Sequence, residues 1–158
     1  MRSFLFISLL FFIACANPSS ESEEEKTDGQ EENGQTPETD LDQALVGLWQ
    51  LEKLEGEDFV MEEGNGLGKT PQISIIAENS RFQGNDGCNN LAGAITNSEK
   101  GSIEFSKIAA TKMACENMDI PDRFANALTN TKKYKLEAGN LFLHDENDKE
   151  LLSLSKVE

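Results

Sequence analysis

The sequence predicts a mainly β (α+β) domain, a small curled antiparallel sheet or barrel of about seven or eight strands with one covering helix. Three observations lead to this fold class. Short runs of apolar residues, several alternating with polar ones, follow one another between residues 46 and 155. Turn-forming Gly, Asn, Asp and Pro residues separate these runs closely, which favours antiparallel pairing. One segment, residues 121–130, has helical periodicity instead.

The first strand is expected over residues 46–54 (VGLWQLEKL), where apolar side chains recur with polar ones between them. The residues assigned to its apolar face are Val46, Leu48, Leu51 and Leu54, with Trp49 out of phase. Five further runs have strand character, in chain order QISIIAE, SRFQG, NLAGAIT, SIEFSKIA and KYKLEA. Tight turns join several of them, so neighbouring runs are expected to pair.

Residues 140–155 (NLFLHDENDKELLSLS) predict a β-hairpin, because two apolar runs flank a polar turn at residues 146–149. The helix is expected over residues 121–130, with Asp119 as its cap and Pro121 in its first turn. The positions that recur at helical spacing are Phe124, Ala127, Leu128 and Thr131. Such a helix is expected to cover one open face or end of the sheet.

The first residues of the chain have the character of an export signal. Arg2 precedes an apolar run that ends at Ala14 and is too short to cross a bilayer, and Cys15 follows directly. This arrangement resembles a bacterial lipobox, which implies removal of residues 1–14 and lipidation of Cys15. The alternative is a plain signal peptide, cut near Ala14 or Ala16, in which Cys15 has no special role.

Residues 15–43 are expected to form a tether, and residues 44–158 the folded domain. Ten acidic side chains and a single base, Lys26, lie between residues 16 and 43. The stretch buries too little apolar surface to offset the entropy of ordering, which predicts disorder. Within it, the run Ser22-Glu23-Glu24-Glu25 resembles an acidic export signal of some Bacteroidetes surface lipoproteins, which implies a domain displayed outside the cell.

Composition and motifs argue against several classes of function. The formal net charge of -15 disfavours a nucleic-acid partner, because phosphate binding needs clustered Lys and Arg. The sequence has no glycine-rich phosphate loop and no G-x-S-x-G elbow. Asp86 is interpreted as a turn former, and the acidic residues 145–150 as a solvated hairpin turn instead of a calcium loop. No cofactor and no metal site are therefore expected.

The motif order of residues 45–157 resembles the META domain family, the HslJ-like heat-shock and envelope lipoproteins. The run FQGNDGCNN at residues 82–90 and the run TKMAC at residues 111–115 carry this resemblance. The motif positions are Gly84, Gly87, Asn89, Asn90, Gly93, Thr111, Met113 and Ala114. The resemblance implies a compact β-rich domain, lipocalin-like in outline, with no established enzymatic activity and an association with envelope stress.

The resemblance also makes proximity of Cys88 and Cys115 an expectation. Lipidation of Cys15 leaves these two cysteines, and an exported domain meets an oxidising compartment, which favours a disulfide. The Gly and Asn residues around Cys88 are then interpreted as a tight turn that presents it to Cys115. A reactive thiol or a metal site stays open as an alternative, although His144 is the only histidine and is expected beside solvent.

Trp49 is expected to pack across one end of the barrel and close its core, with a place in a ligand pocket as the alternative. The function expected from these observations is a non-enzymatic binding or envelope-stress role. The protein would be lipid-anchored at the outer membrane, with its domain displayed at the cell surface or kept in the periplasm, and would bind an envelope protein or a small apolar ligand. Two alternatives are a carrier with an apolar ligand inside the barrel and a thiol enzyme or redox sensor that uses Cys88 or Cys115.

Overall fold

The computed structural model describes residues 41–64, 66–96 and 99–157 of the chain. Within these residues there are two helices, the short 3-10 helix η1 (Gln43–Leu45) and the α-helix α1 (Asp119–Asn130). The strands are β1 (Gly47–Leu54), β2 (Glu57–Asp58), β3 (Gln72–Ile76), β4 (Arg81–Asn85), β5 (Asn90–Thr96), β6 (Glu104–Ala110), β7 (Lys133–Glu137), β8 (Asn140–His144) and β9 (Glu150–Val157). Every run predicted as a strand is present. The two-residue strand β2 was not predicted, because so short a pairing leaves no periodicity in the sequence.

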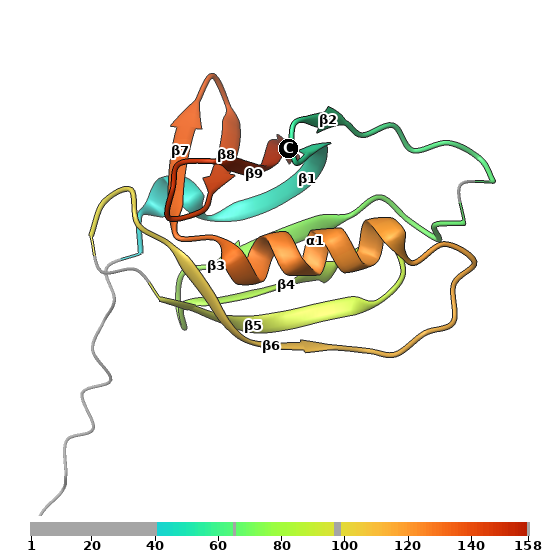
Figure 1. The fold of residues 1–158 in the computed structure, drawn as a ribbon. Coiled ribbons are helices and arrows are strands. Elements are labelled where there is room, and N and C mark those ends of the chain that lie inside the picture. The colour runs from blue at the N-terminus through green and yellow to red at the C-terminus, as the bar shows by residue number, and fades with distance from the viewer. Residues whose placement is uncertain (1–40, 65, 97–98, 158) are drawn as a thin grey trace, which may run out of the picture. The chain divides into compact units, whose positions relative to one another are not determined.

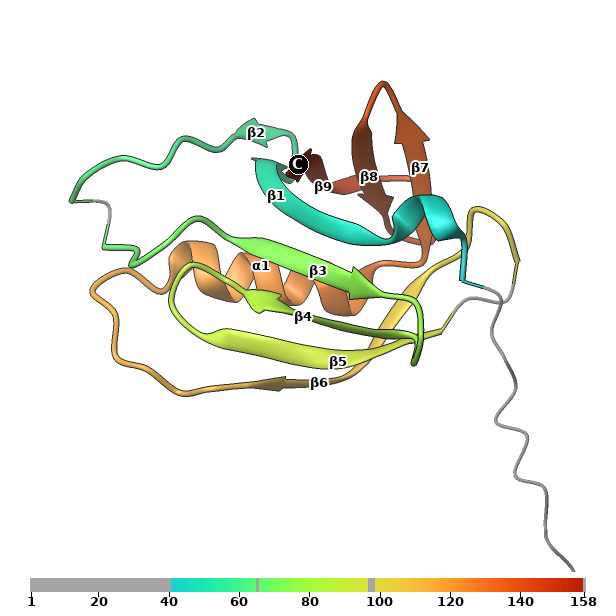
Figure 2. The same cartoon turned by 180° about the vertical axis from the view of Figure 1, so that it is seen from behind.

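All strands belong to one antiparallel sheet with the order β6-β5-β4-β3-β1-β9-β8-β7, and β2 pairs with β1 beside this path. The sheet curls into a half-barrel, and α1 lies on its inner side (Figures 1 and 2). The predicted hairpin is formed by β8 and β9, in which Leu143 pairs with Leu152. The prediction of a mainly β, curled antiparallel fold with one covering helix is therefore confirmed.

The two ends of the sheet meet just before β6 and at the start of β7. Ser102 forms an isolated bridge with Lys133, and the N–H of Tyr134 donates to the carbonyl of Gly101 at 2.9 Å. The N–H of Ile103 donates to the carbonyl of Lys132, just before β7, at 3.1 Å. The half-barrel is thus joined at one point, and α1 runs beside β6 and β9. This contact places the helix where it covers the inner face, as expected.

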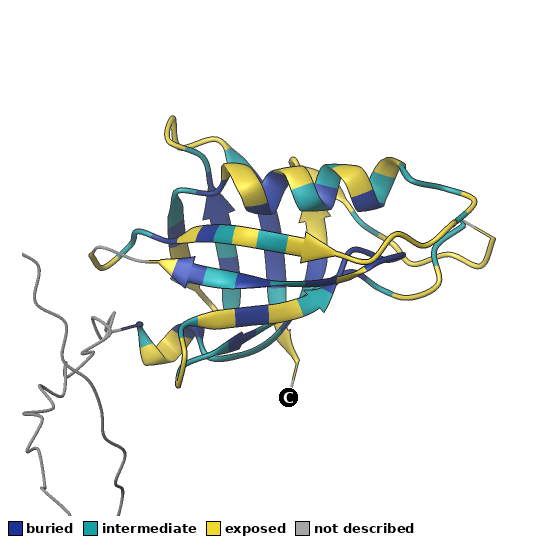
Figure 3. Ribbon diagram, turned by 90° about the horizontal axis from the view of Figure 1, so that it is seen from below, coloured by how far each residue is buried: buried dark blue, intermediate teal, exposed yellow. Residues whose placement is uncertain are grey.

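The buried residues of the core come from the strands of the curled sheet and from α1 (Figure 3). Its largest side chains with less than 2% exposure are Trp49, Phe82, Phe124, Leu45, Leu54, Ile73, Ile75, Ile95, Ile103, Leu128, Leu141 and Leu143. The rings of Phe82 and Phe105 meet edge to face with centroids 5.1 Å apart. All of these residues belong to one compact unit, Thr36–Glu158. A fragment of residues 36–158 therefore carries a complete core of its own.

The phase of β1 differs from the expected one. Trp49 and Leu51 are buried on the core face, whereas Leu48 is only half-buried and pairs with Ser74 on the outer face. The register shifts between Leu51 and Lys53, which returns Leu54 to the core. The interpretation of Trp49 as out of phase was wrong, because this bulge inverts the alternation partway along the strand.

The start of α1 also differs from the prediction. The helix begins at Asp119, so Asp119 lies in the first turn and is not the cap. The residue at the cap position, Met118, makes no side-chain cap bond, and the Asn117 side chain accepts from the N–H of Asp119 at 2.9 Å. The carboxylate of Asp119 contacts Arg123 at 3.4 Å, one turn further on. A carboxylate in the first turn of a helix interacts favourably with the positive end of the helix dipole.

The packed domain includes residues upstream of the boundary predicted at residue 44. Leu41 is buried in the core. Asp42 caps η1, because one of its carboxylate oxygens accepts from the N–H of Ala44 at 3.0 Å. The other oxygen accepts from the hydroxyl of Tyr134 at 2.8 Å. The side chain of Asp42 therefore links the start of the domain to β7.

Acid is expected to weaken this link. The hydrogen bond from Ala44, and then that from Tyr134, hold the pKa of Asp42 below its ordinary value. A carboxylate with a lowered folded-state pKa stabilises the fold above its unfolded pKa, and this contribution is lost as pH falls through the folded pKa. We expect Asp42→Asn to flatten the fall in melting temperature between about pH 5 and pH 2. Circular dichroism of both proteins checks this, and equal pH slopes would contradict it.

Candidate functional site

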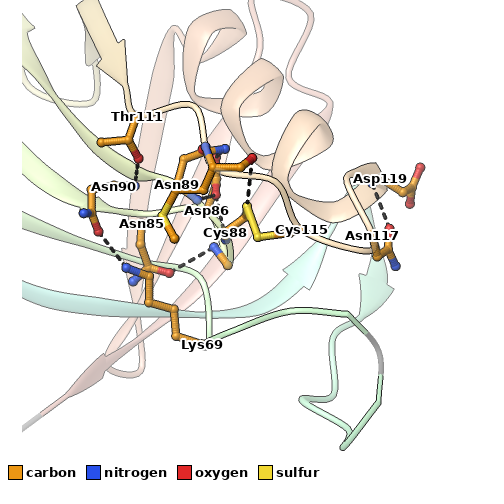
Figure 4. Close-up of a disulfide and its surroundings, with 12 residues drawn as sticks. Lys69, Asn85, Asp86, Cys88, Asn89, Asn90, Thr111, Cys115, Asn117 and Asp119 are labelled. Carbon is orange, nitrogen blue, oxygen red and sulfur yellow. Dashed lines mark hydrogen bonds between the residues drawn. A yellow bond between two sulfur atoms is a disulfide. The ribbon is translucent and has the colours of Figure 1, made fainter.

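The two sequence motifs form one structural unit at the end of the sheet (Figure 4). We call residues 84–90 the glycine turn and residues 111–115 the strap. Cys88 in the glycine turn and Cys115 in the strap are joined by a disulfide, with their Cα atoms 6.1 Å apart. Cys88 is buried and Cys115 is half-buried. The turn therefore presents Cys88 to Cys115, and neither residue carries a free thiol.

Hydrogen bonds continue the contact between the turn and the strap beyond the disulfide. The side-chain oxygen of Asn89 accepts from the N–H of Met113 at 2.9 Å. The N–H of Asn90 donates to the hydroxyl of Thr111 at 3.0 Å, and the N–H of Thr111 donates to the carbonyl of Asn90 at 3.0 Å. Three consecutive residues of the turn thus bind three alternate residues of the strap. This pairing explains why the two motifs occur together in one chain.

A buried carboxylate organises the glycine turn from inside. Asp86 is 2% exposed, and its Oδ1 accepts from the backbone N–H groups of Cys88 and Asn89. Its Oδ2 accepts from the side-chain amide of Asn89 at 3.1 Å. The side chain of Asn85 accepts from the N–H of Gly87, whose φ of 100° favours glycine. The interpretation of Asp86 as a turn former is confirmed.

The motif glycines within the strands allow close packing. A Cβ atom on Gly84 would overlap the carbonyl oxygen of Gln72 on the neighbouring strand. On β5, a Cβ atom on Gly93 would lie 2.5 Å from the ring of Phe82. Both positions face the core, since Gly84 pairs with Ile73 and Gly93 pairs with Phe82. Their role is therefore to let the strands and the core approach each other.

Met113 and Ala114 have exposed side chains although they belong to the motif. The Met113 side chain is 54% exposed, and its backbone N–H is held by the turn. Its carbonyl oxygen lies 3.7 Å from the Sγ of Cys88. This is a contact and not a hydrogen bond, because a disulfide sulfur carries no hydrogen. The strap thus uses its backbone for the fold and presents these two side chains at the surface.

His144 lies in a different part of the sheet from the disulfide. Three strands, β3, β1 and β9, separate β4 from β8, which carries His144. The side chain is 8% exposed, so its expected place beside solvent was wrong. A register shift between Leu143 and His144 changes the alternation there. Its Nδ1 is buried and has no hydrogen-bond partner among the described residues.

The acidic hairpin turn is held by its own first residue. The Oδ1 of Asp145 accepts from the N–H groups of Asn147 at 2.8 Å and Lys149 at 2.9 Å. Asp148 pairs with Lys133 at 2.8 Å. The interpretation of this segment as a solvated turn is confirmed. Over the described ranges, no group of three or more His, Cys, Asp or Glu side chains is arranged to hold a metal ion.

Trp49 links β1 to the start of the domain. The indole is 1% exposed, and its N–H donates to the carbonyl of Leu45 in η1 at 2.7 Å. The ammonium group of Lys156 lies 5.3 Å from the ring centroid. The ring is therefore part of the core, and its hydrogen bond to Leu45 holds η1 against β1. This arrangement is compatible with the predicted role in closing the barrel.

The sequence did not predict a groove on the outer face of β1, β3, β4 and β5. Its volume is about 610 Å³, and it is lined by Leu48, Lys69, Gln72, Ser74, Gln83, Gly84, Asn85, Asn90, Leu91 and Ala92. The signal that could have indicated it is weak. The outward positions of these strands carry mostly small or amide side chains, which leave a hollow instead of a ridge.

These features define a class of protein: a small β half-barrel with an inner helix, in which a disulfide joins a glycine turn to a following strap. The chain belongs to the META domain family, whose family model matches residues 42–158. The resemblance in the motifs is thereby confirmed. No curated protein matches the chain in sequence.

Two solved structures share the fold. One is an NMR structure with 22% identity and a TM-score of 0.54, and the match covers 71% of this chain and 90% of that one. The other is an NMR structure of a protein from Burkholderia xenovorans with 20% identity and a TM-score of 0.55, covering 73% and 85%. At these identities the similarity concerns the fold alone. In the part of the chain that the structure describes, no helix is long and apolar enough to cross a membrane.

Proposed function

We propose that this META-domain protein is a non-enzymatic binding protein of the bacterial cell envelope. It would be anchored by lipid on Cys15 at the outer membrane, with its domain exposed at the surface or in the periplasm. Cys15, the tether and the acidic export signal lie outside the described residues, so these parts of the proposal rest on the sequence. The observation that carries the proposal is the Cys88–Cys115 disulfide. Structural disulfides persist in oxidising compartments, which agrees with export.

The use of the reactive groups supports binding over catalysis. Both cysteines of the domain are consumed by the disulfide, and the carboxylate of Asp86 is occupied by backbone N–H groups. His144 is three strands away and nearly buried. A thiol enzyme or redox sensor needs an accessible thiolate next to a base. The geometry therefore favours a structural role for the glycine turn.

The interior favours a binding site on the surface over a carrier. The space between the sheet and α1 is filled by large side chains, among them Trp49, Phe82 and Phe124. A small apolar ligand inside the barrel would have to displace such side chains, whereas the outer groove is open. Binding on the outer face therefore requires no rearrangement of the core.

Substitution of Cys15 tests the anchor. We expect the wild-type chain, produced in a bacterium that processes lipoproteins, to stay in the membrane fraction after a high-salt wash. Cys15→Ala should move it to the soluble fraction, because each buried lipid methylene contributes about 0.8 kcal/mol. Intact mass of the extracted protein identifies the attached chains. The matched control is Ala16→Ser, which keeps the cysteine.

Two outcomes would contradict the anchor. One is wild-type protein in the soluble fraction, and the other is Cys15→Ala protein that stays membrane-bound. Labelling of exposed lysines on intact cells then separates surface display from a periplasmic position.

A further inference from the structure

The outer groove is formed by one continuous row of side chains across the sheet. The register pairs Leu48 with Ser74, Ser74 with Gln83, and Gln83 with Ala92, so all four point to the same face. In Figure 2 the ribbons of β3, β4 and β5 are seen with no other segment in front of them. The volume of about 610 Å³ lies in the range of ligand sites. The face is therefore accessible and hollowed.

The groove offers free polar groups at a regular spacing. The side chains of Gln72, Ser74 and Gln83 make no hydrogen bond within the described part of the chain. Each glutamine provides both donors and an acceptor. Gln72 and Ser74 are two residues apart on β3, so they repeat at roughly 6.5–7 Å along the strand. This distance equals the repeat of alternate residues in an extended peptide.

The charge of the groove is opposite to that of the chain. Lys69 lies at one end, and its ammonium group donates to the side chain of Asn90 at 2.6 Å, which leaves two of its three donors. None of the lining residues is Asp or Glu, although the net charge of the chain is -15. A second groove, by contrast, is lined by Glu55, Asp145 and Glu146. The outer groove is thus complementary to a carboxylate.

The remaining lining residues narrow the class of occupant. None is aromatic, so a sugar ring or a nucleobase would find no stacking surface. Leu48 and Ala92 provide apolar contact between the polar groups. Side-chain amides match the donors and acceptors of peptide groups. An extended peptide satisfies the amides, the apolar contacts and the ammonium group together.

We propose that the outer groove binds an extended peptide segment of another envelope protein that places a carboxylate against Lys69. Its peptide groups would then hydrogen-bond with Gln72 and Gln83. The inference rests on the proposed binding function and names its class of partner.

The test uses fragment 36–158 and a phage-displayed library of random 12-residue peptides. We expect the selected peptides to be enriched in Asp and Glu, and fluorescence polarisation then measures the affinity of synthesised, labelled peptides. Lys69→Glu should weaken binding at least about 10-fold by reversing the charge. Ser74→Tyr should block it by placing a ring in the groove. Lys135→Glu on β7 makes the same charge change outside the groove and should leave the affinity unchanged.

Each contrary outcome overturns a defined part of the proposal. Failure to select acidic peptides, or equal weakening by Lys69→Glu and Lys135→Glu, would remove the groove as a specific site. Binding of polygalacturonate without any peptide would assign the face to a glycan. Thermal unfolding checks that each variant is folded. We expect the melting temperature of Lys69→Glu to be unchanged, because Lys69 is exposed. Because the fragment lacks Cys15, failure here is distinct from failure of the anchor.

Discussion

Replacing both Cys88 and Cys115 by serine is expected to lower the free energy of unfolding by about 3 to 4 kcal/mol. The two cysteines are 27 positions apart, and cross-linking them removes the entropy of closing this loop from the unfolded chain. For a domain of this size the loss corresponds to a fall in melting temperature of about 10 to 15 °C. Thermal and urea unfolding of fragment 36–158 measure it.

The double serine variant should still fold at room temperature. The hydrogen bond from the N–H of Met113 to the side-chain oxygen of Asn89, and those between Asn90 and Thr111, also hold the strap. Reduced wild-type protein is the matched control and should unfold like the variant. Alkylation of denatured wild-type protein should add no label before reduction and two labels after it. Label before reduction would show that the disulfide is absent, and unchanged stability would show that it does not constrain the chain.

The elements of the fold could be predicted because their signals are local. Alternation and turn residues mark β3 to β9, and the hairpin of β8 and β9 is contained in one continuous run of sequence. The phase of β1 could not be predicted, since it depends on a bulge against β9, more than ninety residues along. Asp119 was misjudged as a cap for a related reason. Asp119 is a good capping residue by type, but the helix places Met118 at the cap position, and the side chain of Asn117 accepts from the N–H of Asp119 instead.

In the candidate site, too, local features could be predicted and contacts between distant segments could not. Glycine and asparagine predicted the tight turn around Cys88, and the pairing with Cys115 came from the resemblance to the META family. The bonds from Asn89 and Asn90 to the strap could not be predicted, because they require the register of β5 against β6. The groove was missed because its row of side chains comes from four strands. No stretch of sequence brings Leu48, Ser74 and Gln83 together.

Truncation of the buried carboxylate in the glycine turn is expected to lower the free energy of unfolding by at least as much as loss of the disulfide does. Asp86→Ala should lower the free energy of unfolding by about 3 to 5 kcal/mol, because it leaves two backbone N–H groups and one amide without an acceptor in a buried site. Asn89→Ala removes a neighbouring side chain of the same turn and serves as the comparison. Urea unfolding of both variants measures the difference.

An exchange of the two side chains separates hydrogen-bond polarity from simple loss of packing. In Asp86→Asn the new amide faces the amide of Asn89, donor against donor, and about 2 to 3 kcal/mol should be lost. In Asn89→Asp two carboxylates meet, with a loss of similar size. The double variant Asp86→Asn, Asn89→Asp restores one donor and one acceptor at each contact. It also keeps an oxygen for the N–H of Met113.

We therefore expect the double variant to be more stable than either single one, with a coupling energy of at least about 2 kcal/mol. Such coupling arises only if the bond between the two side chains forms in the folded state, because a packing defect would add and not cancel. Additive losses would mean that the carboxylate of Asp86 acts through the backbone N–H groups alone. The polarity of the turn would then be set by the chain around Cys88, and the side chain of Asn89 would serve only the strap.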